Sequence, residues 1–349
     1  MSDRAFVERV WYGGDAVAST TRTLLTPFER IFGAVVGARD ILYDAGWLPA
    51  SATAIPAVSI GNLTVGGTGK TPVAAWIARG LLERGAHPAV ILRGYGADEP
   101  LVHKQLNPAV DVIVGADRTT GIARAAATGA DVAVLDDAFQ HRRVQRMADL
   151  VLVSADRWTS DVRLLPAGPW REPLKAVRRA TLVIVTRKAA SDRTVDAVHE
   201  RLSQVAPGIP RVSVRLELTA LVSADDANET RPLETLAGTT VHAVLSIADP
   251  AAFVSQLQAY GATVVPRVFP DHHEFSDADV HGIASGLPRD AMVVCTLKDA
   301  VKLAPRWPRL APRLWYVSQQ VTVERGVGGI ERVLDDLVRA RSRAPTTAG

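Results

Sequence analysis

Short apolar runs alternate along the chain with segments of helical spacing from residue 54 onward. The apolar runs show little internal alternation between apolar and polar positions, which is typical of strands buried on both faces. They lie at residues 57–60, 89–92, 110–114, 132–135, 150–153 and 182–185. Helical segments are expected at 72–84 and 192–205. This pattern predicts an α/β fold with a parallel sheet and helices on both faces.

A second, smaller α/β domain is expected after residue 208, where the sequence Pro-Gly-Ile-Pro at 207–210 interrupts the pattern. Its strands are expected near 211–222, 241–247, 263–268, 292–296 and 314–317, and its last helix at 330–341. The predicted organisation is therefore an N-terminal segment, 1–48, a first domain, 49–208, and a second domain, 209–349.

The N-terminal segment, 1–48, has apolar residues at helical spacing between residues 24 and 36. One interpretation is a helix that packs on the first domain. The other is an amphipathic helix that lies in a bilayer interface. The apolar run 31–38, between Arg30 and Arg39, would span about 12 Å as a helix, against about 30 Å for a bilayer core. We therefore expect no membrane-spanning helix.

The composition is that of a packed globular chain, with 47% apolar and 22% charged residues, and it excludes a disordered protein. The 40 basic and 37 acidic residues give a net charge of +3. This excess is too small to indicate nucleic acid, although it suits an anionic partner. The single cysteine, Cys295, lies in an apolar run, so we expect a buried core residue and no disulfide within the chain.

The strongest chemical signal lies between an expected strand and an expected helix. Glycines there let successive backbone N–H groups face one anion, and the helix N-terminus adds its dipole. Lys70 can reach the β- and γ-phosphates of a nucleotide, and the Thr71 hydroxyl can ligate Mg²⁺. The predicted nucleotide-binding loop consists of Thr64, Val65, Gly66, Gly67, Thr68, Gly69, Lys70 and Thr71.

Acidic and basic residues follow the strand expected at 132–135. Asp136 and Asp137 stand at its end, where a carboxylate beside a phosphate loop can position Mg²⁺. Gln140, His141 and the arginines after them form either a solvated surface or a polar cluster that faces a phosphate, since arginine binds phosphate through two parallel hydrogen bonds.

Two further segments carry ionisable residues after strands. Asp98 lies in the segment 94–100, and His272 and His273 lie in the segment 269–275. Adjacent histidines are poorly spaced to bind one zinc ion, so a metal cage is the less favoured interpretation. An aspartate paired with a histidine is instead suited to remove the proton of an alcohol.

Together these motifs resemble the tetraacyldisaccharide 4′-kinase family of lipid A biosynthesis. The resemblance extends from residue 11 to about 303, and the motifs follow the family's order: 61–72, 93–96, 98–100, 136–141, 165–173, 269–273 and 296–302. The family itself has threonine at the position of Thr64, where the general P-loop pattern has glycine. This chain departs from the family at Ala138, usually glycine, at Leu297, usually glutamate, and at Ala97, which alone separates two motifs.

The resemblance implies a P-loop NTPase-like kinase that uses ATP and Mg²⁺ to phosphorylate the 4′-hydroxyl of a tetraacylated disaccharide 1-phosphate. It implies that Lys70 and the loop amides hold the triphosphate. Asp98 would take the hydroxyl proton, tuned by His272 from the second domain, which suggests domain closure over the nucleotide. The expected metal ligands are Thr71, Asp136, Asp137 and Glu172, and the expected substrate contacts are Gln140, His141 and Arg171.

A lipid with four acyl chains does not leave its bilayer unaided, because each buried CH₂ contributes about 0.8 kcal/mol. The resemblance therefore favours the interfacial interpretation of the segment 1–48, with Arg30 and Arg39 meeting anionic headgroups. It implies a peripheral enzyme at the cytoplasmic face of the bacterial inner membrane. Its expected partners are the lipid disaccharide and the membrane surface, and not nucleic acid.

Three alternatives remain at this point. A regulatory ATPase of the deviant-Walker type would need a second lysine just before the paired glycines, where this chain has Val65. A soluble small-molecule kinase fits the apolar N-terminal segment less well, and a detergent requirement would discriminate against it. A phosphate-binding module without catalysis fits poorly, because carboxylates follow several strands.

Overall fold

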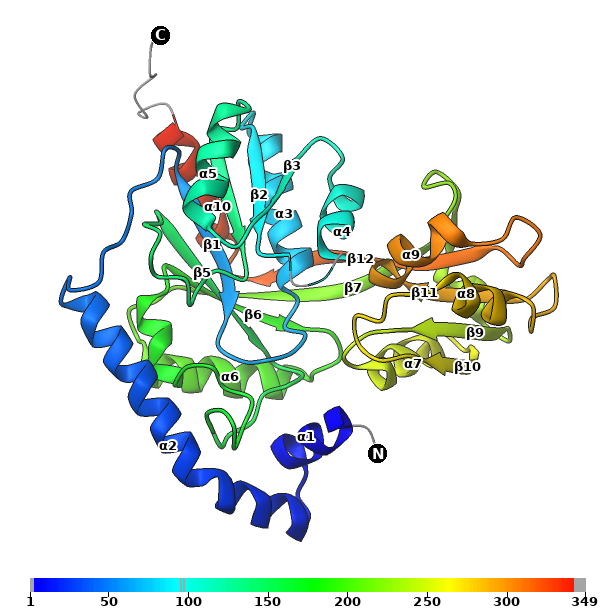
Figure 1. The fold of residues 1–349 in the computed structure, drawn as a ribbon, viewed down its shortest axis with the longest axis horizontal. Helices are drawn as coiled ribbons and strands as arrows, with labels where there is room; N and C mark the ends of the chain where they lie inside the picture. Colours follow the sequence, from blue (N-terminus) through cyan, green and yellow to red (C-terminus); the bar gives the residue numbers. More distant parts are fainter. Residues whose placement is uncertain (1–2, 95, 97, 342–349) are drawn as a thin grey trace. The chain divides into compact units, whose positions relative to one another are not determined.

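The computed structural model describes residues 3–94, 96 and 98–341 and contains two compact units (Figure 1). Unit 1 consists of the chain up to Arg93, Val110–Arg215 and the chain from Thr322, and unit 2 consists of Gly94–Ala109 and Leu216–Val321. Two long strands, β7 (Arg211–Ser223) and β12 (Leu314–Arg325), have residues in both units.

The sheet of unit 1 is parallel, with the strand order β7–β6–β5–β1–β4–β2–β3. Its strands besides β7 are β1 (Ala57–Asn62), β2 (Pro88–Leu92), β3 (Asp111–Val114), β4 (Val132–Asp136), β5 (Ala148–Ser154) and β6 (Leu182–Arg187). β1, β2, β4 and β6 are buried along their whole length, which explains the missing alternation in their sequences. The predicted parallel sheet is confirmed.

Helices cover both faces of this sheet (Figure 1). They are α3 (Lys70–Glu83), α5 (Arg118–Ala127), α6 (Asp192–Val205) and α10 (Val327–Arg341), with a short 3-10 helix, η1 (Leu174–Arg179). Leu135 of β4 packs in the core beneath α5, and Val151 of β5 packs in the core beneath α6. The pairing of both strands with β1 puts these two residues on the same face. α3 and α10 pack together on the opposite face.

Two helices precede the sheet, α1 (Asp3–Tyr12) and α2 (Ala16–Asp44). Asp15 caps α2 by accepting two backbone N–H groups, and its bond with Arg9 helps to lower the pKa of Asp15 to about 2. One face of α2 exposes apolar side chains at helical spacing, here called the α2 stripe: Val17, Leu24, Phe28, Ile31 and Val35. Within the described chain, no helix is long and apolar enough to cross a membrane.

Unit 2 contains a parallel sheet with the order β10–β9–β11–β12. Its other elements are α4 (Asp98–Leu106), β8 (Thr230–Pro232), η2 (Leu233–Leu236), β9 (Thr240–Leu245), α7 (Pro250–Ala259), β10 (Thr263–Val268), α8 (Asp277–Ala284), β11 (Met292–Thr296), α9 (Leu297–Leu303) and η3 (Ala304–Arg306). α4 packs against α9. Cys295 of β11 is fully buried, as expected, and burial raises the pKa of its thiol.

The two units differ from the predicted domains in four segments, the first being 1–48, whose helices α1 and α2 belong to unit 1. Residues 94–109 leave the first sheet after β2 and belong to unit 2, and the chain from Thr322 returns to unit 1. The Pro-rich sequence at 207–210 marks only the turn between α6 and β7, because β7 still pairs with β6 in unit 1. Continuous strands that serve both units leave no break in the sequence pattern for a boundary to be recognised.

Candidate active site

The phosphate loop lies between the end of β1 and the start of α3. Gly66 has a φ of +110° and Gly69 a φ of +86°, backbone conformations that favour glycine. Gly69 is the N-cap of α3, so the first N–H groups of the helix are available to an anion. Lys70 and Thr71 follow as the first helical residues. The predicted loop therefore has the backbone geometry of an anion site.

Hydrogen bonds from β1, β6 and the segment before Trp170 stabilise the conformation of this loop. The Thr186 hydroxyl at the end of β6 donates to the carbonyl oxygen of Thr68 at 2.9 Å. The Asn62 side-chain amide at the end of β1 donates to the Thr68 hydroxyl at 2.8 Å. The Val65 N–H donates to Pro169 O at 2.8 Å. Asn62 received no role from the sequence, although its position at the end of the strand before the loop was a usable signal.

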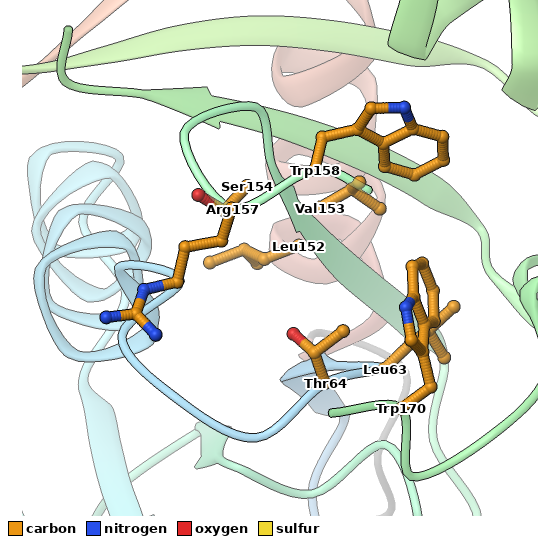
Figure 2. Close-up of a pocket in the computed structure, with 8 residues that line it drawn as sticks. All are labelled: Leu63, Thr64, Leu152, Val153, Ser154, Arg157, Trp158 and Trp170. Carbon is orange, nitrogen blue, oxygen red and sulfur yellow. The ribbon is translucent and has the colours of Figure 1, made fainter. Parts of the chain in front are cut away.

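A small cavity lies behind the loop (Figure 2). Its volume is about 10 Å³, which is room for roughly one water molecule. Thr64, Arg157, Trp158 and Trp170 are among the residues that line it. A cavity of this size cannot hold a nucleotide.

Lys70, Asp137 and Arg171 form a charged cluster beside the loop. Arg171 binds both oxygens of Asp137, at 2.9 Å and 3.3 Å, and Lys70 Nζ lies 3.8 Å from Asp137 Oδ1. Burial acts to raise the pKa of Asp137, but Lys70 and Arg171 outweigh it and hold this pKa below its usual value. Lys70 Nζ also donates to the Asn62 side-chain oxygen at 3.3 Å. Asp137 is therefore anionic, and its backbone φ of +49° lies in the left-handed region.

The donor atoms near the loop fit a magnesium ion bound mainly through nucleotide phosphates. Asp136 ends β4 and Thr71 is the second residue of α3, and both side chains are buried. Among the described residues, no three histidine, cysteine or acidic side chains converge as a complete metal cage. Mg²⁺ commonly takes one or two protein oxygens and completes its shell with phosphates and water. The hydroxyl of Thr71 and the carboxylates of Asp136 and Asp137 supply that kind of ligand.

Two of the three expected substrate contacts lie in this cluster. Arg171 is described above, and Gln140 donates through Nε2 to the carbonyl oxygen of Asn62 at 2.9 Å. Gln140 Oε1 is buried, and no described residue satisfies it. His141 is half-buried among Arg118 and Arg146, so burial and these cations lower its pKa and keep the ring neutral near pH 7.

Glu172 is placed differently from the expectation. Its side chain is fully buried, and its two oxygens bind Arg39 of α2 at 2.6 Å and Arg179 of η1 at 2.5 Å. Arg179 also binds Asp40, and its guanidinium lies 4.6 Å from the centre of the Phe139 ring. In this structure Glu172 is the centre of a buried ion-pair network, and it would have to release an arginine before it could ligate Mg²⁺.

Asp98 and His272 form a pair within unit 2. Asp98 is the first residue of α4 and is 2% exposed, and its Oδ1 lies 3.1 Å from His272 Nδ1. Burial acts to raise the pKa of Asp98, but His272 overcomes it and lowers that pKa. The same contact raises the pKa of His272. The expectation that the two residues lie on separate domains is wrong, because residues 94–109 belong to unit 2.

The backbone around this pair leaves little space. A Cβ at Gly96 would collide with Asp98 Oδ1 and would lie 2.9 Å from His272 Nδ1. Tyr95 and Ala97, which flank Gly96 in the sequence motif, lie outside the described residues. His272 has a φ of +57°, and its N–H donates to Ser246 O at 3.1 Å.

A buried network of hydrogen bonds supports the loop that carries His272. Lys302 Nζ donates to the carbonyl oxygen of His273 at 3.0 Å and to the Ser246 hydroxyl at 2.6 Å. Asp299 has no exposed surface and accepts hydrogen bonds from Ser246 and Thr296. Thr296, Asp299 and Lys302 lie in the motif at 296–302, whereas Ser246 lies in no motif, because its contact with them depends on the pairing of β9 with β11.

Comparison with known proteins gives consistent matches. The family model described as tetraacyldisaccharide-1-P 4′-kinase matches residues 21–339. A protein of Anaeromyxobacter sp. (strain Fw109-5) named tetraacyldisaccharide 4′-kinase is 38% identical, over 94% of this chain and 95% of its own length. A protein of the same name from Halorhodospira halophila is 37% identical, over 85% of this chain and 88% of its own length. The crystal structure titled as LpxK from Aquifex aeolicus in complex with ATP has a TM-score of 0.70 and 26% identity, with 92% of this chain and 99% of that chain covered.

Proposed function

The chain belongs to the tetraacyldisaccharide-1-P 4′-kinase family, and from that premise we propose that it transfers the γ-phosphate of ATP to the 4′-hydroxyl of tetraacyldisaccharide 1-phosphate in lipid A biosynthesis. The observation that carries this proposal is the glycine loop before α3, with Lys70 and Asp137 beside it. The related structure from Aquifex aeolicus was solved with ATP, which supports ATP as the donor.

Unit 1 supplies the nucleotide site. The backbone N–H groups of residues 66–71 bind the triphosphate, and Lys70 neutralises its outer phosphates. Mg²⁺, held by Thr71 with Asp136 or Asp137, neutralises charge on the phosphates when bound. Arg171 keeps Asp137 in place through two hydrogen bonds. This arrangement positions the donor and offsets its charge, which is the main requirement of phosphoryl transfer.

Unit 2 supplies the base. The 4′-oxygen forms a bond to the γ-phosphorus, the bond from that phosphorus to the β–γ bridging oxygen breaks, and the hydroxyl proton passes to Asp98. The lowered pKa of Asp98 keeps it ionised at neutral pH, so it is ready to accept that proton. His272 orients the Asp98 carboxylate through the 3.1 Å contact.

The lipid acceptor requires the enzyme to reach a bilayer. The α2 stripe is the apolar surface that would enter it, and exposed Arg30 lies beside Ile31. Arg39 was expected to meet headgroups, but its guanidinium instead binds Asp40 and Glu172. We place the enzyme peripherally at the cytoplasmic face of the inner membrane, where ATP and the growing lipid meet.

The decisive experiment is transfer of labelled γ-phosphate from ATP to purified tetraacyldisaccharide 1-phosphate in mixed micelles. The expected product is a bisphosphorylated lipid whose formation requires both Mg²⁺ and the acceptor. Label transfer to water alone, or to water-soluble acceptors without detergent, would contradict the proposal and would favour an ATPase or a soluble small-molecule kinase.

A further inference from the structure

Arg157 is a cation beside the phosphate loop that the family resemblance did not single out. It follows β5, and the pairing of Asn62 with Leu152 sets the end of β5 next to the end of β1. A Cβ built on Gly66 would lie 3.3 Å from Arg157 Nη1, so the guanidinium lies directly against the loop backbone. Figure 2 shows the side chain extended away from Trp158 toward the loop that leads into α3.

The residues before and after Arg157 in the sequence are both anchored by contacts, which fixes the position of the Arg157 backbone. The Asp156 carboxylate accepts the backbone N–H groups of residues 188–190 at 2.7–2.8 Å. On the other side, Trp158 packs edge-on against Trp170, with 5.9 Å between ring centres. The approach of Arg157 to Gly66 is therefore built into the fold, and a cation held in advance costs little reorganisation when charge develops.

The partners of Arg157 in this structure come partly from α1. Its Nη1 lies 3.6 Å from Glu8 Oε1, and its guanidinium lies 5.6 Å from the centre of the Tyr12 ring. The Arg157 side chain is 18% exposed and that of Glu8 is 36% exposed. The pair is long, and solvent reaches the Glu8 carboxylate, so a phosphate can replace or join Glu8 at the Arg157 guanidinium.

We propose that Arg157 binds the terminal phosphate of ATP as a second cation beside Lys70. The inner phosphates belong to the amides at the start of α3. Gly66 lies on the opposite limb of the loop, so Arg157 stands at the outer end of the triphosphate. Deviant-Walker ATPases carry a second lysine on this limb, at the position of Val65, and here a separate element brings the charge. This proposal rests on the proposed function, because it requires ATP in the loop.

Calorimetric titration of the full chain in detergent with Mg²⁺-ATP and with Mg²⁺-ADP tests it. Arg157→Met keeps the apolar stem and removes the charge. ATP affinity should fall about 10- to 100-fold while ADP affinity changes less than about 3-fold, because a charged hydrogen bond is lost only with ATP. Lipid phosphorylation should slow by at least about 100-fold. Arg163→Met is the matched control from the same segment, and both nucleotides should bind it as they bind the wild type.

Equal loss of ATP and ADP affinity, or unchanged ATP affinity with an unchanged rate, would overturn the proposal. If Arg157→Met does not fold, Arg157→Lys provides the same comparison, with the ATP-to-ADP affinity ratio expected to fall about 3- to 10-fold. A wild-type protein that binds no ATP would sink the proposed function itself. A wild type that binds and turns over ATP while Arg157→Met retains its ATP-to-ADP ratio would sink only the role of Arg157.

Discussion

Asp98 and His272 are 174 positions apart in the chain, yet His272 Nδ1 lies 3.1 Å from Asp98 Oδ1 within unit 2. The aspartate is nearly inaccessible, whereas the histidine side chain is 41% exposed. His272 contacts Oδ1 of this buried carboxylate, and in the proposed reaction Oδ2 would accept the proton of the substrate hydroxyl. In the proposed reaction, Asp98 would therefore be the base and His272 the residue that positions it.

Asp98→Asn should slow lipid phosphorylation about 10²- to 10⁴-fold, which is the usual contribution of a general base. The affinity for Mg²⁺-ATP should stay within about 2-fold, because the proposed nucleotide contacts lie in unit 1. Steady-state rates with labelled ATP, together with calorimetric ATP binding, separate the two effects. Turnover of the lipid acceptor at the wild-type rate would show that Asp98 is not the base.

The Asp98–His272 pair also predicts a pH-dependent contribution to stability. Asp98 has a lowered pKa, so its contribution is complete above the unfolded value of about 3.9 and is lost as the pH falls through the folded value. His272 has a raised pKa, so its contribution is complete below about 6.5 and is lost as the pH rises through the folded value. The stability difference between wild type and His272→Gln should therefore be greatest between about pH 4 and 6.5.

Urea unfolding of both proteins from pH 3 to pH 9 measures that difference. His273→Gln is the comparison from the same loop, because the partly buried His273 ring binds Asp279 rather than Asp98 and stacks on Phe269. A wild-type advantage that is constant across this pH range would contradict an ionised pair.

Gly96→Ala should disrupt the pair without altering either ionisable residue. The added methyl group would meet Asp98 Oδ1 and His272 Nδ1, so one of the two side chains has to move. Because effects on geometry act on the chemical step, kcat should fall at least about 10-fold with little change in ATP affinity. Gly67→Ala is the comparison for ATP binding. Gly67 lies in the phosphate loop, and its Cβ would meet no atom within 4 Å, so this substitution leaves the Asp98–His272 pair unchanged. If both substitutions changed the ATP affinity equally, the separation between the chemical step at Asp98 and ATP binding at the phosphate loop would be wrong.

The phosphate loop and the central strands were predictable because their signals are local. Residues 64–71 carry the glycines, the lysine and the hydroxyl within one loop, and buried parallel strands read as apolar runs. The contacts of Glu172 were not predictable. Its partner Arg39 is 133 positions away, and nothing in an arginine on an amphipathic helix distinguishes an internal ion pair from a headgroup contact.

The same limit applies to unit 2. The motif at 94–100 follows β2 of unit 1, so chain order favours a place in the first domain, but its helix packs on α9. Arg157 shows the limit most clearly. One arginine among many in a loop gains its significance only when the pairing of β5 with β1 brings it to Gly66.

Arg39→Met should destabilise unit 1 because it leaves one oxygen of the fully buried Glu172 without its cation. Breaking a buried pair costs about 3–5 kcal/mol, but Arg39 is 31% exposed, so we expect about 1–3 kcal/mol from urea unfolding. The double variant Arg39→Met/Glu172→Gln should recover part of this loss, since it removes the unpaired charge. If the loss of stability in the double variant equals the sum of the losses in the two single variants, Arg39 and Glu172 are not energetically coupled.

The α2 stripe should determine membrane binding. Phe28 and Ile31 are 60% and 63% exposed, and full burial of such side chains contributes about 1.5–3 kcal/mol each. Phe28→Ser/Ile31→Ser should therefore lower partition onto phosphatidylglycerol vesicles by about 10- to 100-fold in a sedimentation assay. Thermal stability should be unchanged, because neither side chain contributes to a folded core. Leu310→Ser is the matched control, since Leu310 is 79% exposed in unit 2 and its loss should leave partition unchanged. If the stripe variant and the wild type sediment equally with vesicles, α2 does not carry the enzyme to its lipid, and the acceptor must reach the site by another surface.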